Sequence, residues 1–490
     1  MTDGATALVV LTGLVGIFLL WALGANDVAN ALGTSVGSGA LSMRSAIALG
    51  VTFEVLGATL VGGNVSTTIG TSIVDPTTIA SAQHFMLLMF SALFGSAAWI
   101  TACTQLSMPV SSTHAIIGSV IFCALSDAED PAHASGVHWG VVGKIILSWF
   151  LSPAAGFSIA YLTQKFIDYA ILNHVDMNEE FGRTASMWEA AVLGPRGGLV
   201  PAWVAIIVGI SSASVVVFVL IGGPASLRVD LSSLGYMVVF TLASGLAAGI
   251  LLAISAFQSR IARLRSVTQL YAVQEGDGGA SVIEGHSERD ALKVGQGGST
   301  ALGNEPLEVI VNPYDRFFLV PMVISACAMA FAHGGNDVAN AVGPFSMVLK
   351  VATDSTIKSS DRIPAKYLET TETPLVVCVA GGLAISLGLA TSGAQVMETI
   401  GRNITRLSLC KGWAAQNAAA TSVLFATVLG LPISSSCVLV GAVMGVGSAA
   451  GGERPNWSIF GKIVATWVAT LPAAGIISAT LYQVAKLGYE

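Results

Sequence analysis

The chain has 490 residues, of which 53% are hydrophobic and 10% are charged, and its formal net charge is −7. A soluble protein of this length needs a more charged surface, so the composition excludes that class and indicates an integral membrane protein. The acidic balance gives no basic footprint and does not point to nucleic acid as a partner. The apolar runs approach 20 residues and do not alternate with polar residues, so we expect spanning helices and not a β-barrel.

The apolar runs predict twelve membrane segments. In chain order they lie near 6–24, 45–63, 85–105, 109–126, 139–170, 198–222, 236–258, 318–333, 374–392, 412–430, 432–448 and 458–486. The polar, Gly- and Ser-rich stretch 259–317 cannot bury enough apolar area to fold, so we expect a disordered central loop there. The first run lacks a basic leader and a clear cleavage site, and we expect it to be retained as a span.

Four sequence blocks occur twice and in the same order. As first and second copies they lie at 24–30 and 334–340, 56–70 and 387–401, 106–120 and 429–443, and 143–156 and 461–475. A nearly constant offset over four blocks indicates a duplicated chain. The predicted organisation is a first repeat at 1–172, two linking spans within 173–258, the central loop, and a second repeat at 318–490.

The number of expected crossings sets the relative orientation of the two copies. Seven crossings separate the start of the first copy from the start of the second, and an odd number gives the copies opposite orientations. A hairpin of two half-crossings leaves this parity unchanged. The predicted fold is therefore an all-α polytopic membrane protein with about 12 segments in two inverted-topology repeats, an architecture usual in secondary transporters.

Loop charges predict how the chain is oriented in the membrane. Lys and Arg residues follow the fifth, seventh and ninth segments, whereas the stretches 64–84 and 126–136 contain none. The positive-inside rule places the central loop in the cytoplasm and both termini outside, with the chain integral to the plasma membrane. The loop 349–373 carries four basic residues on the opposite side and is the exception.

An Asn–Asp pair stands at the end of an apolar run in each copy. A carboxylate at membrane depth is costly unless it is paired, hydrated or bound to a cation, so Asp27 and Asp337 are candidates for a functional site. Neighbouring glycines weaken the helix there, and freed carbonyls with carboxylate and amide oxygens would suit Na⁺. Helix capping at the interface is the alternative, and the repetition favours function. The expected Na⁺ ligands are Asp27, Asp337, Asn26, Asn336 and the mid-span Glu54.

A proline and a hydroxyl-rich cluster open the fourth and eleventh segments, in "MPVSSTH" and "LPISSSC". These residues mark a helix start, whose free N–H groups and dipole bind anions. Each cluster closely follows another apolar run, so we expect it at the tip of a re-entrant hairpin, where two tips clasp one tetrahedral oxyanion. Surface capping is the alternative. The expected anion-binding residues are Ser111, Ser112, Thr113, Ser434, Ser435, Ser436, Asn26, Asn336 and Gln105, the last of which could equally bond a neighbouring helix.

The segments "GANDVANALGTSVGSG" and "GGNDVANAVGP", together with the serine clusters, resemble the inorganic phosphate transporter (PiT) family of sodium–phosphate symporters. The resemblance covers both copies, about 20–160 and 320–485. It implies uptake of phosphate with Na⁺, or with H⁺ in some members, by an inverted-repeat protein that is often dimeric. It assigns the ion–phosphate centre to the Asn–Asp pairs and serine clusters, and matches the family's second-span acid to Glu54. Two departures are Gln416, where many eukaryotic members carry an acid, and Cys437, where relatives often have histidine.

The sequence therefore predicts a Na⁺-coupled symporter of inorganic phosphate in a lipid bilayer, a homodimer with no cofactor and no enzymatic activity. The same fold could move sulfate or use H⁺, but sulfate cannot donate a hydrogen bond to acceptors such as Asp27, Asp337 and Glu54. A channel is disfavoured by the broken helices, and a membrane receptor by the lack of a sizeable outer domain. His333, at the end of the eighth segment, is expected only to face water.

Overall fold

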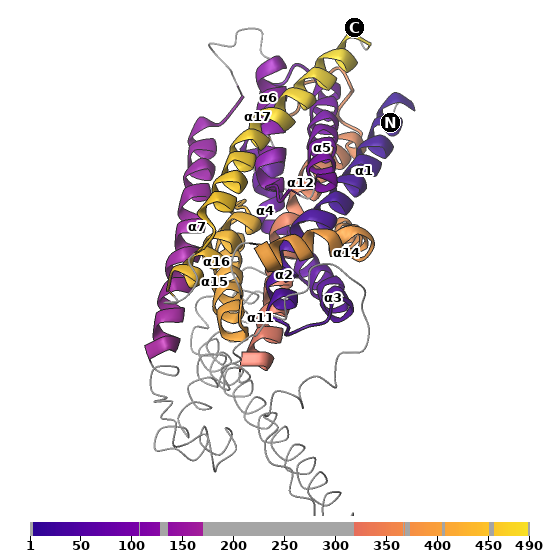
Figure 1. Cartoon of the computed structure of the whole chain (residues 1–490). Helices are drawn as coiled ribbons and strands as arrows, with labels where there is room; N and C mark the ends of the chain where they lie inside the picture. Colours follow the sequence, from indigo (N-terminus) through magenta and orange to yellow (C-terminus); the bar gives the residue numbers. More distant parts are fainter. Residues whose placement is uncertain are drawn as a thin grey trace, which may run out of the picture.

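The computed structural model describes residues 3–106, 108–127, 136–169, 318–365, 367, 373–403, 407–449 and 455–488. These residues form a bundle of helices, and a single isolated β-bridge joins Val74 to Val137 (Figure 1). The two expected linking spans and the expected central loop lie outside the described residues.

The described helices fall into two series, one before residue 170 and one after residue 317. The first series is α1 (Asp3–Leu23), η1 (Gly24–Val28), α2 (Ala29–Gly37), α3 (Met43–Val61), α4 (Gly63–Thr67), η2 (Thr68–Ser72), η3 (Pro76–Thr78), α5 (Ala82–Gln105), α6 (Ser112–Asp127) and α7 (Trp139–Ile167). The second is α11 (Leu319–Asp337), α12 (Ala339–Thr353), α14 (Leu375–Asn403), α15 (Leu409–Val428), α16 (Ser435–Ala449) and α17 (Trp457–Leu487). Serine or asparagine side chains cap the starts of α3, α5, α15 and α17, as helix-start chemistry requires.

Seven helical stretches in the described part of the chain are long and apolar enough to cross a membrane. They are Ala5–Gly37, Met43–Val61, Ala82–Gln105, Trp139–Ile167, Leu319–Thr353, Leu375–Ala394 and Trp457–Leu487. The prediction of an all-α polytopic membrane protein is thereby confirmed.

Two of these spans contain the Asn–Asp pairs near their middle. The predicted ends of the first span at 24 and of the eighth at 333 were wrong, because the helical path continues for 33 residues in Ala5–Gly37 and for 35 in Leu319–Thr353. The first path passes through one turn of π-helix, η1, and the second turns at the single residue Val338. Figure 1 shows α1–α2 running away from the end of the bundle that holds both termini, and α11–α12 running toward it.

The two series are interlaced through close helix crossings. Helix α3 packs against α11, and α14 packs against α1, η1 and α2. A Cβ at Gly57 or Gly388 would collide with a backbone carbonyl of the crossing helix, and so would one at Gly334 or Gly24. The glycines that suggested a weakened helix are therefore needed because another backbone lies against them.

Each series also contains a helical hairpin, α5–α6 and α15–α16. The second arms have 16 and 15 residues, so they extend about 24 Å or less, short of the ~30 Å hydrocarbon core. Helix α6 packs against α17 and α16 against α7, so each short helix is supported by the last long helix of the other series.

The stretch 64–84, which the sequence suggested was an extramembrane loop, is largely helical. Helix α4 and the π-turn η2 pack against α12, and Ile69, Gly70 and Thr71 are buried. The basic loop after α12 lies at the end of the bundle that holds both termini (Figure 1). There, carbonyls of Ser359 and Asp361 accept hydrogen bonds from the first N–H groups of α5.

Candidate functional site

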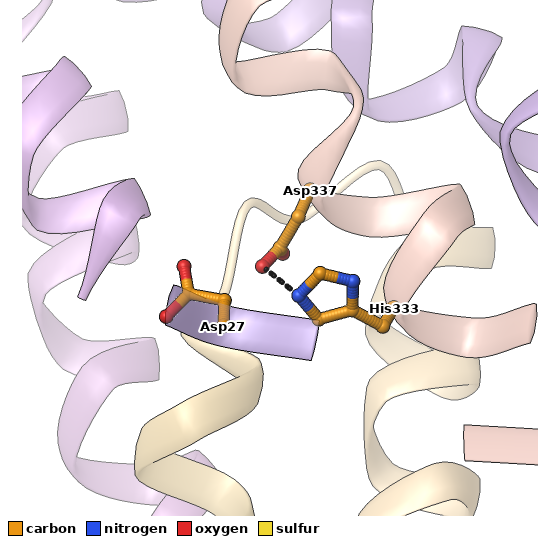
Figure 2. A group of neighbouring side chains, drawn as sticks. All are labelled: Asp27, His333 and Asp337. Atoms are coloured by element: carbon orange, nitrogen blue, oxygen red, sulfur yellow. Dashed lines mark ion pairs between the residues drawn. The ribbon is translucent and has the colours of Figure 1, made fainter. Parts of the chain in front are cut away.

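The two Asn–Asp pairs meet at the centre of the bundle. All five residues of η1 are buried, and π-turns of this kind occur frequently at functional sites. Figure 2 shows Asp27 from η1 approaching His333 and Asp337, which both come from α11. Ligand atoms of these three side chains all lie within 4.8 Å of one another.

The two carboxylate oxygens of Asp27 differ, because one accepts a hydrogen bond and the other has no partner among the described residues. Its Oδ1 accepts a hydrogen bond from Ser436 Oγ of the other copy at 2.9 Å. Its Oδ2 is buried and has no partner among the described residues. An ionised carboxylate oxygen in this position needs a proton, a water molecule or a cation.

Asp337 has a different environment, although its place in the repeat is the same. Its Oδ2 accepts from Ser435 Oγ at 2.9 Å and lies 2.9 Å from His333 Nε2. His333 Nδ1 in turn lies 3.0 Å from Glu54 Oε1. The ring can donate to both carboxylates at once only in its doubly protonated form, in which the Glu54–His333–Asp337 row carries a net charge of about −1.

The expectation that His333 faces water was wrong, because its exposed fraction is 0%. The matching residue in the first copy is Leu23, so the histidine is not part of the chemistry that the two copies repeat. One signal was available: a histidine four residues before an aspartate on a helix presents its ring to that carboxylate.

Glu54 is buried, as a functional acid in a membrane span would be, but it is not beside Asp27. The imidazole of His333 separates it from Asp337. Any influence of Glu54 on an ion between the two aspartates is therefore exerted through His333.

The two asparagines fasten the hairpin tips of their own copies. Asn26 Nδ2 donates to Thr104 Oγ1 at 3.0 Å and to the Met108 carbonyl at 3.2 Å, and its Oδ1 accepts from the Val110 N–H at 3.2 Å. The amide that should be free to meet an anion is thus bonded to the α5–α6 tip.

Asn336 makes the matching contacts in the second copy. Its Nδ2 donates to Thr427 Oγ1 at 3.0 Å and to the Leu431 carbonyl at 3.3 Å. With the amide rotated, Oδ1 accepts from Thr427 Oγ1 at 3.0 Å and Nδ2 donates to the Ile433 carbonyl at 3.0 Å. In either orientation the side chain holds the α15–α16 tip.

The three residues of each hydroxyl cluster have three separate roles. Ser111 Oγ accepts from the His114 N–H at 3.3 Å, and Ser434 Oγ accepts from the Cys437 N–H at 3.2 Å. These first serines are N-caps of α6 and α16, but they are buried, unlike the surface caps of the alternative interpretation.

Of the four remaining hydroxyls, three bond to residues of the other copy, and Ser435 bonds to Asp337 of its own copy. Thr113 Oγ1 donates to the Ile433 carbonyl at 3.0 Å, and Ser112 Oγ accepts from Asn340 Nδ2 at 3.2 Å. Ser435 and Ser436 bond to the two aspartates as described above. The N-terminal ends of α6 and α16 therefore both lie beside the aspartate pair.

Gln105 was expected to bind the anion, and the structure places it elsewhere. It is exposed at the last turn of α5, whereas all six hydroxyl residues of the clusters are buried. Gln105 directly follows Thr104, which bonds to Asn26, but adjacent residues of a helix point in different directions, so its side chain does not reach the site.

The segments that build the site, 24–30, 106–120, 334–340 and 429–443, contain no Lys or Arg. Helix N-termini and hydroxyl hydrogens are its donors, and carboxylates are its acceptors. Such a centre can bind an anion only if cations, protons or dipoles offset the carboxylate charge.

The family model for the phosphate transporter family matches residues 23–478. The chain belongs to the phosphate transporter family. Membership agrees with the resemblance in the duplicated Asn–Asp and serine motifs, and the match extends over both series of helices.

Relatives of similar length support membership of the phosphate transporter family. A Pyrococcus abyssi protein named "Putative phosphate permease" is 31% identical over 477 residues, which are 97% of each chain. A Chlamydia pneumoniae protein named in the same way is 34% identical over 474 residues, or 96% of each chain. Among solved structures, one titled "The sodium-dependent phosphate transporter" has a TM-score of 0.72 and 28% identity, and the match covers 98% of this chain and 99% of that one.

Proposed function

We propose that the chain is a secondary active transporter that moves inorganic phosphate together with Na⁺, and not an enzyme. The observation that carries this proposal is the meeting of the N-terminus of α16 with both aspartates, through Ser435 on Asp337 and Ser436 on Asp27. Donors for an oxyanion and acceptors for a cation thus occupy one centre.

The proposed cation position lies at Asp27, with Asp337 on its other side. The unpartnered Asp27 Oδ2 fits a hard cation, and the hydroxyl of Ser436 provides a further oxygen nearby. Glu54 would act on this position through His333. The asparagines, proposed from sequence as direct ligands, would act mainly by holding the hairpins in place.

The proposed phosphate position lies at the starts of α6 and α16. Ser112, Thr113, Ser435 and Ser436 supply hydroxyls there, while the capping serines Ser111 and Ser434 orient the first turns. A bound cation reduces the cost of bringing phosphate next to the carboxylates, and phosphate does the same for the cation, which couples their movement. Alternating access would arise as one part of the interlaced bundle moves against the other.

The orientation proposed from loop charges puts the central loop in the cytoplasm and both termini outside, in the plasma membrane, and we propose a homodimer in the lipid bilayer. Opposite directions of α1–α2 and α11–α12 support an inverted repeat (Figure 1). Protease accessibility of tags at the two termini of intact cells tests the orientation, and cross-linking in membranes tests the dimer.

Uptake of radiolabelled phosphate into proteoliposomes tests the function. An inward Na⁺ gradient should drive accumulation, and an equal K⁺ gradient should not. Accumulation under an H⁺ gradient alone would replace Na⁺ with H⁺ as the driver, and stronger uptake of sulfate than phosphate would change the substrate. Absence of accumulation of either anion under every gradient would contradict the proposal.

A further inference from the structure

A second set of buried polar groups lies one helical turn beyond Asp27, between α2 and α15. Gln416 of α15 is fully buried, with an exposed fraction of 0%. Its Oε1 accepts hydrogen bonds from Thr34 Oγ1 at 2.9 Å and Ser35 Oγ at 2.8 Å. Its Nε2 donates to the Ala31 carbonyl at 2.7 Å.

The three partners come from one face of α2, because residues 31, 34 and 35 are spaced i, i+3 and i+4. Each of them presents an oxygen toward Gln416. Apart from the hydroxyl hydrogens, the only positively polarised group in this set is the amide nitrogen Nε2 of Gln416 itself. It occupies the position where an oxygen-lined site would hold a cation.

This arrangement occurs once in the two copies. By the offset that relates Thr104 to Thr427, the first-copy residue that matches Gln416 is Leu93, which is buried and apolar. The amide is therefore not required by the hairpin architecture, which forms with leucine at the matching position.

We infer that Gln416 determines how many cations the transporter takes, because its amide nitrogen fills a cation position beside α2. The inference rests on the proposed cation coupling. A glutamate at 416 would keep the bonds from Thr34 and Ser35 but would put a carboxylate oxygen against the Ala31 carbonyl. Two acceptors at that separation repel unless a cation lies between them, so the substitution creates a demand for a cation where the wild-type chain needs none.

Flux ratios in proteoliposomes test this inference. Wild-type protein and Gln416→Glu are reconstituted side by side, and the uptake of ²²Na⁺ and ³³P-phosphate is measured over a range of Na⁺ concentrations. The ratio of Na⁺ to phosphate should rise by about one in Gln416→Glu, with a steeper Na⁺ dependence. Gln416→Leu, which removes the amide without adding charge, should leave the ratio unchanged. An unchanged ratio in Gln416→Glu, or a new requirement for protons in place of Na⁺, would overturn the inference.

A binding measurement separates this inference from the proposed function. Na⁺ should raise the melting temperature of Gln416→Glu in detergent more than that of the wild type, with K⁺ as the control salt. Addition of Thr34→Val to Gln416→Glu should reduce that gain. In an otherwise wild-type chain, Thr34→Val should not change the Na⁺-to-phosphate ratio, and a change there would overturn the inference even if Gln416→Glu did not fold. Lack of Na⁺-driven uptake by the wild type would contradict the proposed function and leave the melting test standing.

Discussion

The two Asn–Asp pairs have the same sequence, but only the asparagines make matching contacts in the two copies. Asn26 and Asn336 each bond to a threonine and a backbone carbonyl of the hairpin in their own copy. Asp27 keeps an unpartnered oxygen, whereas Asp337 contacts His333. The two asparagines thus make matching contacts, whereas the electrostatic surroundings of the two aspartates differ.

The difference originates at the two helix crossings. Where α3 crosses α11, Glu54 and His333 form a buried ion pair. At the crossing of α14 with α1, the residues aligned with these are Ile385 and Leu23, both fully buried. The same backbone geometry therefore accommodates either a charged pair or an apolar pair, which makes the apolar pair a natural reference for experiments.

His333→Leu should have the largest effect on stability, because it leaves Glu54 buried without its partner. Removal of one member of a buried ion pair costs about 3–5 kcal/mol of the free energy of unfolding. The double variant Glu54→Ile/His333→Leu copies the other crossing and should recover most of that loss. Thermal denaturation of the three proteins in detergent measures the effect, and additive losses in the double variant would show that the two crossings are not interchangeable.

Asp27→Asn should reduce phosphate uptake at limiting Na⁺ by about 100-fold, equivalent to about 2.7 kcal/mol, because it removes the charge at the unpartnered oxygen. Asp337→Asn should have a smaller effect, about tenfold, since His333 keeps its bond to Glu54. The Na⁺ concentration that gives half-maximal uptake in proteoliposomes distinguishes them. Equal shifts in the two variants would mean that the carboxylates share the cation evenly.

Asn26→Ala and Asn336→Ala should lower stability by similar amounts, about 2 kcal/mol each, because each frees polar groups at a buried hairpin tip. Thr104→Val and Thr427→Val remove one partner from each clamp and serve as matched, milder variants. Melting temperatures of the four proteins provide the comparison. A difference of more than about 1 kcal/mol between the asparagine variants would argue against equivalent roles.

Ser436→Ala should have the smallest effect, a rise of about fivefold in the Na⁺ concentration for half-maximal uptake, because one hydrogen bond to Asp27 is lost. Thr113→Val changes the matching residue, whose hydroxyl bonds to the Ile433 carbonyl and not to a carboxylate. It should leave the Na⁺ dependence unchanged. A shift in Thr113→Val as large as that in Ser436→Ala would remove the distinction between the two hydroxyls.

The sequence predicted the features that both copies repeat. The hairpins, the helix starts at the serine clusters and the meeting of the two aspartates all follow from paired blocks with identifiable chemistry. A feature present in one copy, such as His333, gave no repeated signal. The prediction put Gln105 in the site because the repeat shows which hairpin a residue belongs to. The repeat does not show which way a side chain in the last turn of α5 points, because that depends on how the hairpin packs.

The glycines beside the aspartates illustrate a second limit. From sequence, Gly24 and Gly334 indicated weakened helices, and the helices nevertheless continue through both sites. A glycine that breaks a helix and a glycine that allows another backbone to approach have the same local sequence. Only the position of the crossing helix distinguishes them, and that helix is distant in the sequence: Gly24 meets Ile385, and Gly334 meets Glu54.

The interlaced crossings have a consequence for how the protein is made. Helix α3 is synthesised long before α11, and α1 long before α14, yet these are the helices that pack together. When the ribosome has delivered only the first copy, the glycine faces of α1 and α3 and the acid Glu54 still lack the surfaces that cover them. Completion of the ion-binding centre is therefore a late event of biosynthesis, and a chain truncated before α11 would enter the membrane with Glu54 uncovered.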